Sequence, residues 1–262
     1  MQRAGIQAHM NYMRLRCFFG LLLIATLGGA CNPKDIEMEA PTGTPAESHS
    51  MRVGNDERTY QIHVPQRSAP ESGWPLVIVV HGLGSDASQM RALTGFDDLA
   101  EEKGFIAVYP DGLARAWLDA GISDRFSDTD IATRNLDFME ALVEELDREH
   151  GVDDRRIYMT GLSNGGMFAF HAACQMSDRL AAIGLVAAAS ISQSYDNCEP
   201  EVPVAYIAFH GTSDTVVPYE GGPVVTGFDA LGEYQSAHEA AKFWAGINGC
   251  PANPHREDLP AI

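Results

Sequence analysis

The sequence is poor in positive charge, with 18 lysines and arginines against 36 aspartates and glutamates among its 262 residues. The formal net charge of −18 would repel a phosphate backbone, so we expect no nucleic-acid partner and interpret the acidity as a source of solubility. Charged residues make up only 21% of the chain and hydrophobic residues 45%, which excludes disorder over most of it. The sequence also lacks a His/Glu cluster with zinc-ligand spacing and a glycine-rich phosphate loop.

The apolar run of residues 17–27 is too short to span a bilayer comfortably. Three arginines and no acidic residue precede it, and the small residues 28–30 follow it. This order is typical of a secretory signal, so we expect residues 1–30 to be a signal peptide and the protein to be extracellular or periplasmic.

Cys31 directly follows this segment, and the stretch Leu27-Gly28-Gly29-Ala30-Cys31 resembles a bacterial lipobox. The resemblance implies a lipidated Cys31 that attaches the protein to a membrane, as in an outer-membrane lipoprotein. The lipobox has a large aliphatic residue where Gly28 stands, so ordinary cleavage near Ala30 remains an open alternative. Residues 31–50 are rich in Pro, Thr, Ser and Glu and predict a flexible linker before a folded domain at 51–262.

The folded part alternates between strand and helix patterns. The expected strands are an antiparallel edge strand at 59–64, buried strands at 75–81 and 105–109, a short strand at 157–160, and further strands at 180–188 and 204–209. The expected helices are at 87–102, 135–150, from the turn after 160 to about 175, and at 233–247, the last with Tyr234, Ala237, Ala241 and Trp244 on one face. This alternation predicts an α/β fold with a mostly parallel central sheet and helices on both faces.

The segment Gly161-Leu162-Ser163-Asn164-Gly165 lies between a predicted strand and a predicted helix. This is the context in which Gly-x-Ser-x-Gly forms a strained turn that lifts the serine hydroxyl clear of the sheet. The glycines prevent collisions at the turn, and the N–H of Asn164 is expected to face a developing oxyanion. The motif predicts Ser163 as a catalytic nucleophile, and a tight turn without a catalytic role is the alternative.

A second oxyanion donor is expected from His81-Gly82-Leu83-Gly84, which directly follows the predicted strand 75–81. The glycines let the backbone approach a ligand, and the N–H of Leu83 is the candidate donor. His81 precedes the serine in the chain and is expected to be structural.

An acid is expected on the loop after the predicted strand 204–209, and Asp214 lies there. In the chain order serine then acid, Asp214 would orient a histidine base. Asp196 and Asp229 are alternatives that follow no buried strand as closely, and His210 is expected to brace the loop.

Several segments together resemble the family of secreted polyhydroxybutyrate depolymerases and feruloyl esterases within the α/β-hydrolase superfamily. These segments are Val80-His81-Gly82, Tyr109-Pro110-Asp111-Gly112, Gly161 to Met167, His210 to Asp214, Val217-Pro218-Tyr219, and Trp244 with Asn248-Gly249-Cys250.

This resemblance implies an α/β-hydrolase fold and an acyl-enzyme mechanism on carboxylic esters, with no metal or organic cofactor. The substrate would be a hydroxyalkanoate polymer or oligomer, or a hydroxycinnamoyl or acetyl ester. Trp117, on the loop after the predicted strand 105–109, would stack on the acyl group or, as an alternative, anchor the loop in the core.

The catalytic histidine has no good candidate after Asp214. His238 falls inside the predicted helix 233–247, and His255 follows Cys250 without an intervening strand. The family has a further strand and a histidine loop that are missing here. We therefore expect a C-terminally truncated copy of a longer esterase, inactive as written, with its histidine beyond residue 262.

The cysteines fit this interpretation. Cys174 and Cys198 are candidates for a disulfide, since one ends the helix after Ser163 and the other precedes the strand 204–209. Cys250 is left over, and the resemblance implies a partner further along the chain. Two other functions stay open: a peptidase or lactone hydrolase on the same fold, and a non-catalytic or degenerate hydrolase-fold surface protein.

Overall fold

The computed structural model describes residues 48–117, 130–223, 232–251 and 253–258. The expected signal peptide, Cys31 and most of the expected linker lie outside these residues. Among the described residues, no helix is long and apolar enough to cross a membrane.

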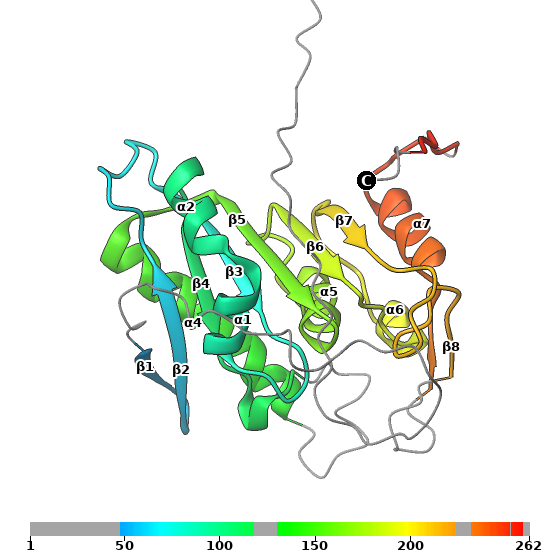
Figure 1. Ribbon diagram of the computed structural model, residues 1–262, viewed down its shortest axis with the longest axis horizontal. Helices are drawn as coiled ribbons and strands as arrows, with labels where there is room; N and C mark the ends of the chain where they lie inside the picture. The colour runs from blue at the N-terminus through cyan, green and yellow to red at the C-terminus, as the bar shows by residue number, and fades with distance from the viewer. Residues whose placement is uncertain (1–47, 118–129, 224–231, 252, 259–262) are drawn as a thin grey trace, which may run out of the picture. The chain divides into compact units, whose positions relative to one another are not determined.

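A seven-stranded sheet forms the centre of the described part, in the order β1-β2-β4-β3-β5-β6-β7 (Figure 1). The pairs β1–β2 and β2–β4 are antiparallel, and all later pairs are parallel. The strands are β1 (Ser48–Val53), β2 (Asp56–His63), β3 (Trp74–Val80), β4 (Ile106–Pro110), β5 (Val152–Leu162), β6 (Ala182–Val186) and β7 (Ala205–Phe209). The predicted mostly parallel sheet is therefore confirmed.

The edge strand was placed wrongly by the sequence pattern. The predicted strand 59–64 corresponds to β2, which is an inner strand because β1 pairs with its other side. β1 and β2 join through a tight turn at Gly54, whose φ of +57° suits glycine. The first three residues of β1 fall in the segment that was expected to be linker.

Helices cover the sheet from both faces (Figure 1). On one face, α1 (Ala87–Thr94) and α2 (Phe96–Lys103) pack on β3 and β4 around Val79, Met90 and Ala107. On the other face, α4 (Ile131–His150), α5 (Asn164–Gln175) and α7 (Ala237–Ile247) enclose the larger core. The short helices η2 (Leu113–Arg115) and α6 (Ser192–Asp196) and a small sheet of β8 (Gly222–Pro223) and β9 (Glu233–Tyr234) complete the described elements.

Three predicted helices differ from the observed ones. The helix expected at 135–150 begins four residues earlier, at Ile131. The helix expected at 87–102 is broken at Gly95, which has a left-handed φ of +64° and ends α1. The helix expected at 233–247 begins only at Ala237, because Ser236 caps it and Tyr234 belongs to β9. Ala241, expected on its apolar face, is exposed.

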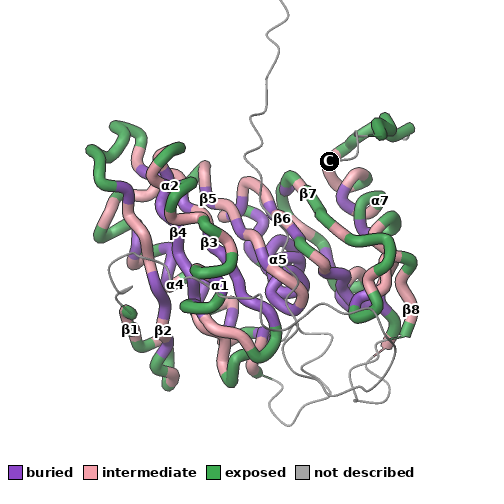
Figure 2. The backbone as a smooth tube through the Cα atoms, viewed as in Figure 1, coloured by how far each residue is buried: buried purple, intermediate pink, exposed green. Residues whose placement is uncertain are grey.

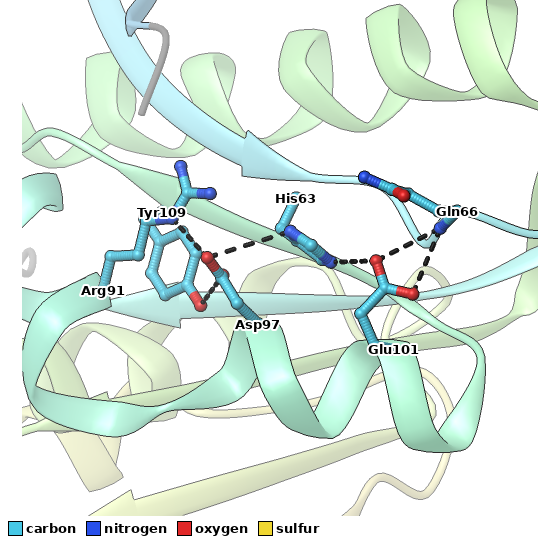
Figure 3. A network of polar contacts seen from close by, with 6 residues as sticks. All are labelled: His63, Gln66, Arg91, Asp97, Glu101 and Tyr109. Atoms are coloured by element: carbon cyan, nitrogen blue, oxygen red, sulfur yellow. Dashed lines mark hydrogen bonds and ion pairs between the residues drawn. The ribbon is translucent and has the colours of Figure 1, made fainter. Parts of the chain in front are cut away.

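A polar network ties α1 and α2 to β2 and β4 (Figure 3). Asp97 accepts hydrogen bonds from Arg91 Nε at 2.6 Å and from the hydroxyl of Tyr109 at 2.8 Å. Glu101 accepts one from His63 Nε2 at 2.9 Å. Burial, aided by the nearby Asp97 carboxylate, raises the pKa of Tyr109, so its hydroxyl remains a donor to Asp97.

The far edge of the sheet is exposed. β7 has no strand on its outer side among the described residues, and Figure 2 shows exposed backbone along it. Ile207 and Phe209 are 54% and 60% exposed on this strand. Inner parallel strands of such a sheet are buried on both faces, so the exposed apolar side chains of β7 mark it as an uncovered edge.

Cys174 and Cys198 form a disulfide, and Cys250 is an exposed free thiol. The disulfide joins the last turn of α5 to the chain that leads from α6 into β7.

Candidate active site

The turn between β5 and α5 carries Ser163 at the carboxyl edge of the sheet. Its backbone has φ +53° and ψ −121°, a conformation that costs free energy for any residue with a side chain. The N–H of Ser163 donates to the carbonyl oxygen of Val186 at the end of β6, at 2.9 Å. The carbonyl oxygen of Ser163 accepts from the N–H groups of Gly166 and Met167 in the first turn of α5. The turn is thus fixed between β6 and α5.

Three glycines make this turn fit against its neighbours. A Cβ added to Gly165 would collide with the carbonyl oxygens of Val80 and His81, and one added to Gly161 would collide with Gly165. A Cβ on Gly166 would lie 2.5 Å from that of Ala188. The first turn of α5 therefore packs directly on the end of β3, where no side chain has room.

The loop after β3 lies beside the serine. A Cβ added to Gly82 would be 3.7 Å from the Cβ of Ser163. Within the described ranges, the N–H groups of Leu83 and Asn164 have no hydrogen-bond partner. Two unpaired main-chain donors, one on each chain segment next to Ser163, can bind an anionic oxygen.

His81 holds the loop after β3 as a neutral side chain. Its Nδ1–H donates to the carbonyl oxygen of Gly82 at 2.7 Å, and its Nε2 accepts from the N–H of Gly112 at 3.0 Å. The side chain is fully buried, and burial lowers the pKa of His81. With both ring nitrogens occupied by main-chain groups, His81 has no free nitrogen to act as a base.

Asp214 lies on the loop after β7, two strands along the same sheet edge from Ser163. Its Oδ1 accepts from the N–H groups of Val216 and Val217 at 2.8 and 2.9 Å. Its Oδ2 is 3.7 Å from His210 Nε2, which donates to the carbonyl oxygen of Val217 at 2.7 Å. The loop therefore fixes one carboxylate oxygen and leaves the other for a further donor. The alternative Asp196 lies in α6, and Asp229 lies outside the described residues.

Neither histidine that follows Asp214 in the chain forms an ion pair with it. His238 is exposed in the first turn of α7 and forms no ion pair with Asp214. Asn248 Nδ2 donates to the carbonyl oxygen of Val204, just before β7, so the end of α7 lies at the opposite edge of the sheet. The segment with His255 follows from there and is exposed (Figure 1).

Trp117 is a loop anchor, and its expected role in stacking on an acyl group does not fit its burial. Its ring is 1% exposed and stacks on Phe168 with centroids 4.9 Å apart. Its main-chain N–H and carbonyl are both bonded to the side-chain amide of Asn164, at 2.7 and 2.6 Å. Sequence reasoning gave Asn164 only a main-chain role and missed this contact.

Exposed apolar side chains surround the same edge. They come from the loop after β3, the ends of β6 and β7, and the loop of Asp214: Leu83, Val186, Phe209 and Val216. Among the described residues, no group of three or more His, Cys, Asp or Glu side chains could hold a metal ion. This edge of the sheet thus combines a serine, two unpaired main-chain N–H groups that can bind an anion, and exposed apolar surface.

The sequence is similar to a family of esterases and to individual members of known activity. The model of the Phospholipase/Carboxylesterase family matches residues 64–228, more than half of the chain. Feruloyl esterase B of Piromyces equi is 29% identical over 201 residues, which cover 74% of this chain and 36% of that protein. The bifunctional acetylxylan esterase/xylanase of Neocallimastix patriciarum is 28% identical over 164 residues, 62% of this chain and 22% of that protein. The chain thus spans well under half the length of these two relatives.

Solved structures show the same architecture. The CE1 ferulic acid esterase of Anaeromyces mucronatus superposes with a TM-score of 0.55 at 17% identity, over 84% of this chain and 86% of that one. A thermostable esterase gives a TM-score of 0.57 at 20% identity, over 78% of this chain and 52% of that one. Together with the sheet order, these likenesses confirm the predicted α/β-hydrolase fold.

Proposed function

Because the chain belongs to the phospholipase/carboxylesterase family, we propose that it hydrolyses carboxylic esters through an acyl-enzyme on Ser163. The observation that carries the proposal is the strained Ser163 between two unpaired N–H groups, those of Leu83 and Asn164. Backbone strain is retained where the surrounding structure enforces it, and it concentrates at active sites. Unpaired main-chain donors beside a nucleophile are the elements of an oxyanion hole.

In the proposed mechanism, the Ser163 hydroxyl attacks the ester carbonyl carbon while a histidine accepts the hydroxyl proton. The carbonyl oxygen becomes an oxyanion that accepts hydrogen bonds from the N–H groups of Leu83 and Asn164. The intermediate then expels the alcohol, which takes the proton from the histidine, and the acyl group remains on Ser163. Water, deprotonated by the same histidine, attacks this ester, and the histidine returns the proton to the Ser163 oxygen as the carboxylic acid is released.

We propose Asp214 as the acid that orients this histidine, and a histidine outside residues 48–258 as the base. Oδ2 of Asp214 accepts no hydrogen bond within the described residues, while Oδ1 is fixed by the N–H groups of Val216 and Val217, which supports the first assignment. The exposed apolar edge at Ile207 and Phe209 supports the second, because a further strand paired with β7 would cover it and end at the same sheet edge as Asp214.

For the substrate, we propose a hydroxycinnamoyl or acetyl ester. The similarity to a feruloyl esterase and an acetylxylan esterase supports this class. The exposed Leu83, Val186, Phe209 and Val216 support it as well, since they offer apolar surface to an acyl or aryl group. Export through residues 1–30, with lipidation at Cys31, belongs to the same proposal and rests on the N-terminal pattern.

The first experiment is to sequence the reading frame past codon 262 and express the full-length protein. A fluorophosphonate probe should label the wild type and leave Ser163→Ala unlabelled. Absence of labelling in the wild type would contradict the proposed function and favour a non-catalytic surface protein.

Substrate class is tested on the same protein with methyl ferulate, an acetylated xylan, a polyhydroxybutyrate film and a peptide. We expect turnover of methyl ferulate or acetylxylan. Preference for the polyester film would overturn the proposed class, and preference for the peptide would indicate a peptidase. Rapid ester turnover by residues 31–262 alone would contradict the external base, and His238→Ala and His255→Ala would then identify the base.

A further inference from the structure

The loop at residues 112–117, which follows β4, has a strained backbone. Ala114 and Arg115 have φ values of +52° and +60°, and neither is a glycine. Two consecutive residues in this region persist only where the surrounding contacts enforce the conformation. The turn is closed by hydrogen bonds from the N–H of Arg115 to Gly112 and from the N–H of Ala116 to Leu113.

Arg115 holds Gly84 from both sides. Its carbonyl oxygen accepts from the N–H of Gly84 at 2.8 Å, and its Nε–H donates to the carbonyl oxygen of Gly84 at 2.8 Å. Its Nη2 lies 3.0 Å from Oδ2 of Asp86, whose Oδ1 caps α1 at the N–H of Gln89. The planar guanidinium can serve both acceptors at once, which a lysine ammonium cannot do with the same geometry.

Gly84 lies in a turn that the N–H of Ser85 closes by a hydrogen bond to the carbonyl oxygen of Gly82, and among the described residues the main-chain groups of Gly84 itself are bound by Arg115 alone. It has a φ of +75°, and a Cβ added there would meet nothing within 4 Å. Its neighbour Leu83 is 64% exposed. The N–H of Leu83, the donor of the proposed oxyanion hole, therefore sits on a loop whose position depends on the contacts to Arg115.

The same loop also holds the second donor. The side chain of Asn164 binds the main chain of Trp117, two residues after Arg115. The N–H of Gly112 binds His81 at the start of the other donor loop. One segment of six residues thus contacts both chain segments that carry the unpaired N–H groups.

We propose that Arg115 is a positioning residue for the oxyanion hole, which sets the place of the Leu83 N–H through Gly84. The inference rests on the proposed esterase function. A donor moved by about 1 Å can lower the rate about 100-fold, because the hydrogen bond to the oxyanion forms only in the transition state. Arg115 touches no reacting atom, so its loss should lower kcat and leave KM nearly unchanged.

The test compares Arg115→Met, Arg115→Lys and Arg148→Met in the full-length protein with an ester that the wild type hydrolyses. Arg148 is an exposed arginine on α4 with carboxylate partners, so it controls for the loss of a surface ion pair. We expect Arg115→Met to lower kcat about 10- to 100-fold with KM within about twofold. Arg115→Lys should lower kcat by a similar factor, and Arg148→Met should match the wild type.

Equal kcat values for Arg115→Met and Arg148→Met would overturn the inference, as would a rise in KM at unchanged kcat. Urea midpoints show whether each variant is folded. If Arg115→Met does not fold, Arg115→Lys decides, and wild-type kcat in that variant overturns the inference. A wild type without esterase turnover or fluorophosphonate labelling contradicts the proposed function itself, whereas an active wild type with an unaffected Arg115→Met contradicts only the role of Arg115.

Discussion

Replacing Ser163 by glycine should make the protein more stable. The residue has φ +53° and ψ −121°, and such backbone conformations cost about 1–3 kcal/mol for a residue with a Cβ. Glycine removes this cost but gives the unfolded chain more freedom, which offsets about 0.5–1 kcal/mol. Within the described residues the Ser163 hydroxyl makes no capping hydrogen bond to α5, so its removal forfeits little. The net gain for Ser163→Gly is about 1 kcal/mol, within a span of about 0–2.5 kcal/mol.

Ser163→Ala is the matched control, because it removes the hydroxyl and keeps the Cβ at the same positive φ. Its stability should stay close to that of the wild type, with Ser163→Gly above both. Urea unfolding of the three proteins measures these free energies directly. In thermal unfolding, each kcal/mol corresponds to a shift of about 2–4 °C in Tm for a domain of this size. A Ser163→Gly variant no more stable than Ser163→Ala would refute the idea that the serine turn stores strain.

Three further results are expected. Gly165→Ala should lower the free energy of unfolding in urea by about 3 kcal/mol or more, because the added Cβ collides with main-chain oxygens. The control Gly211→Ala should be near neutral, since an added Cβ there has nothing within 4 Å. Equal losses in the two variants would contradict the close packing of α5 on β3. Burial lowers the pKa of His81 below its usual 6.5, so only the unfolded chain takes up this proton as the pH falls from 6.5 toward the folded pKa. Stability should therefore drop by up to about 1.4 kcal/mol per pH unit in that window, and the same slope in His81→Gln would argue against this source. Ile207→Lys on the exposed edge of β7 should reduce self-association of residues 31–262 in analytical ultracentrifugation, and an equal effect from Leu93→Lys on α1 would point to net charge instead.

Much of the fold follows from local patterns. The apolar runs correctly predicted β3 and β4, a strand was expected where β7 lies, and the strand–turn–helix around Ser163 lies where the motif predicts it. Two misses had local signals. Gly95 is followed by Asp97 and Asp98 in the first turn of α2, a pattern typical of a helix end and a new start. The Gly54-Asn55 pair after an alternating stretch favours the hairpin of β1 and β2.

The remaining site contacts could not be read from the sequence. Arg115 and Gly84 are 31 residues apart, and Asn164 and Trp117 are 47 apart. No local pattern specifies which main-chain group such side chains bind, because the contacts exist only once β3, β4 and β5 are paired. The burial of Trp117 has the same origin, since its ring packs on α5.

Because Cys174 and Cys198 form a disulfide, the stability of the region around Ser163 depends on whether the protein folds in an oxidising compartment. The disulfide closes a loop with a sequence separation of 24, which corresponds to about 3–4 kcal/mol of stability. It fastens the helix that begins just after Ser163 to the chain that leads into the strand of Asp214. Protein produced in a reducing cytosol would have the same sequence but would lack this covalent link between α5 and the chain before β7. The activity measured on such protein would then depend on the fraction of molecules in which the disulfide has formed.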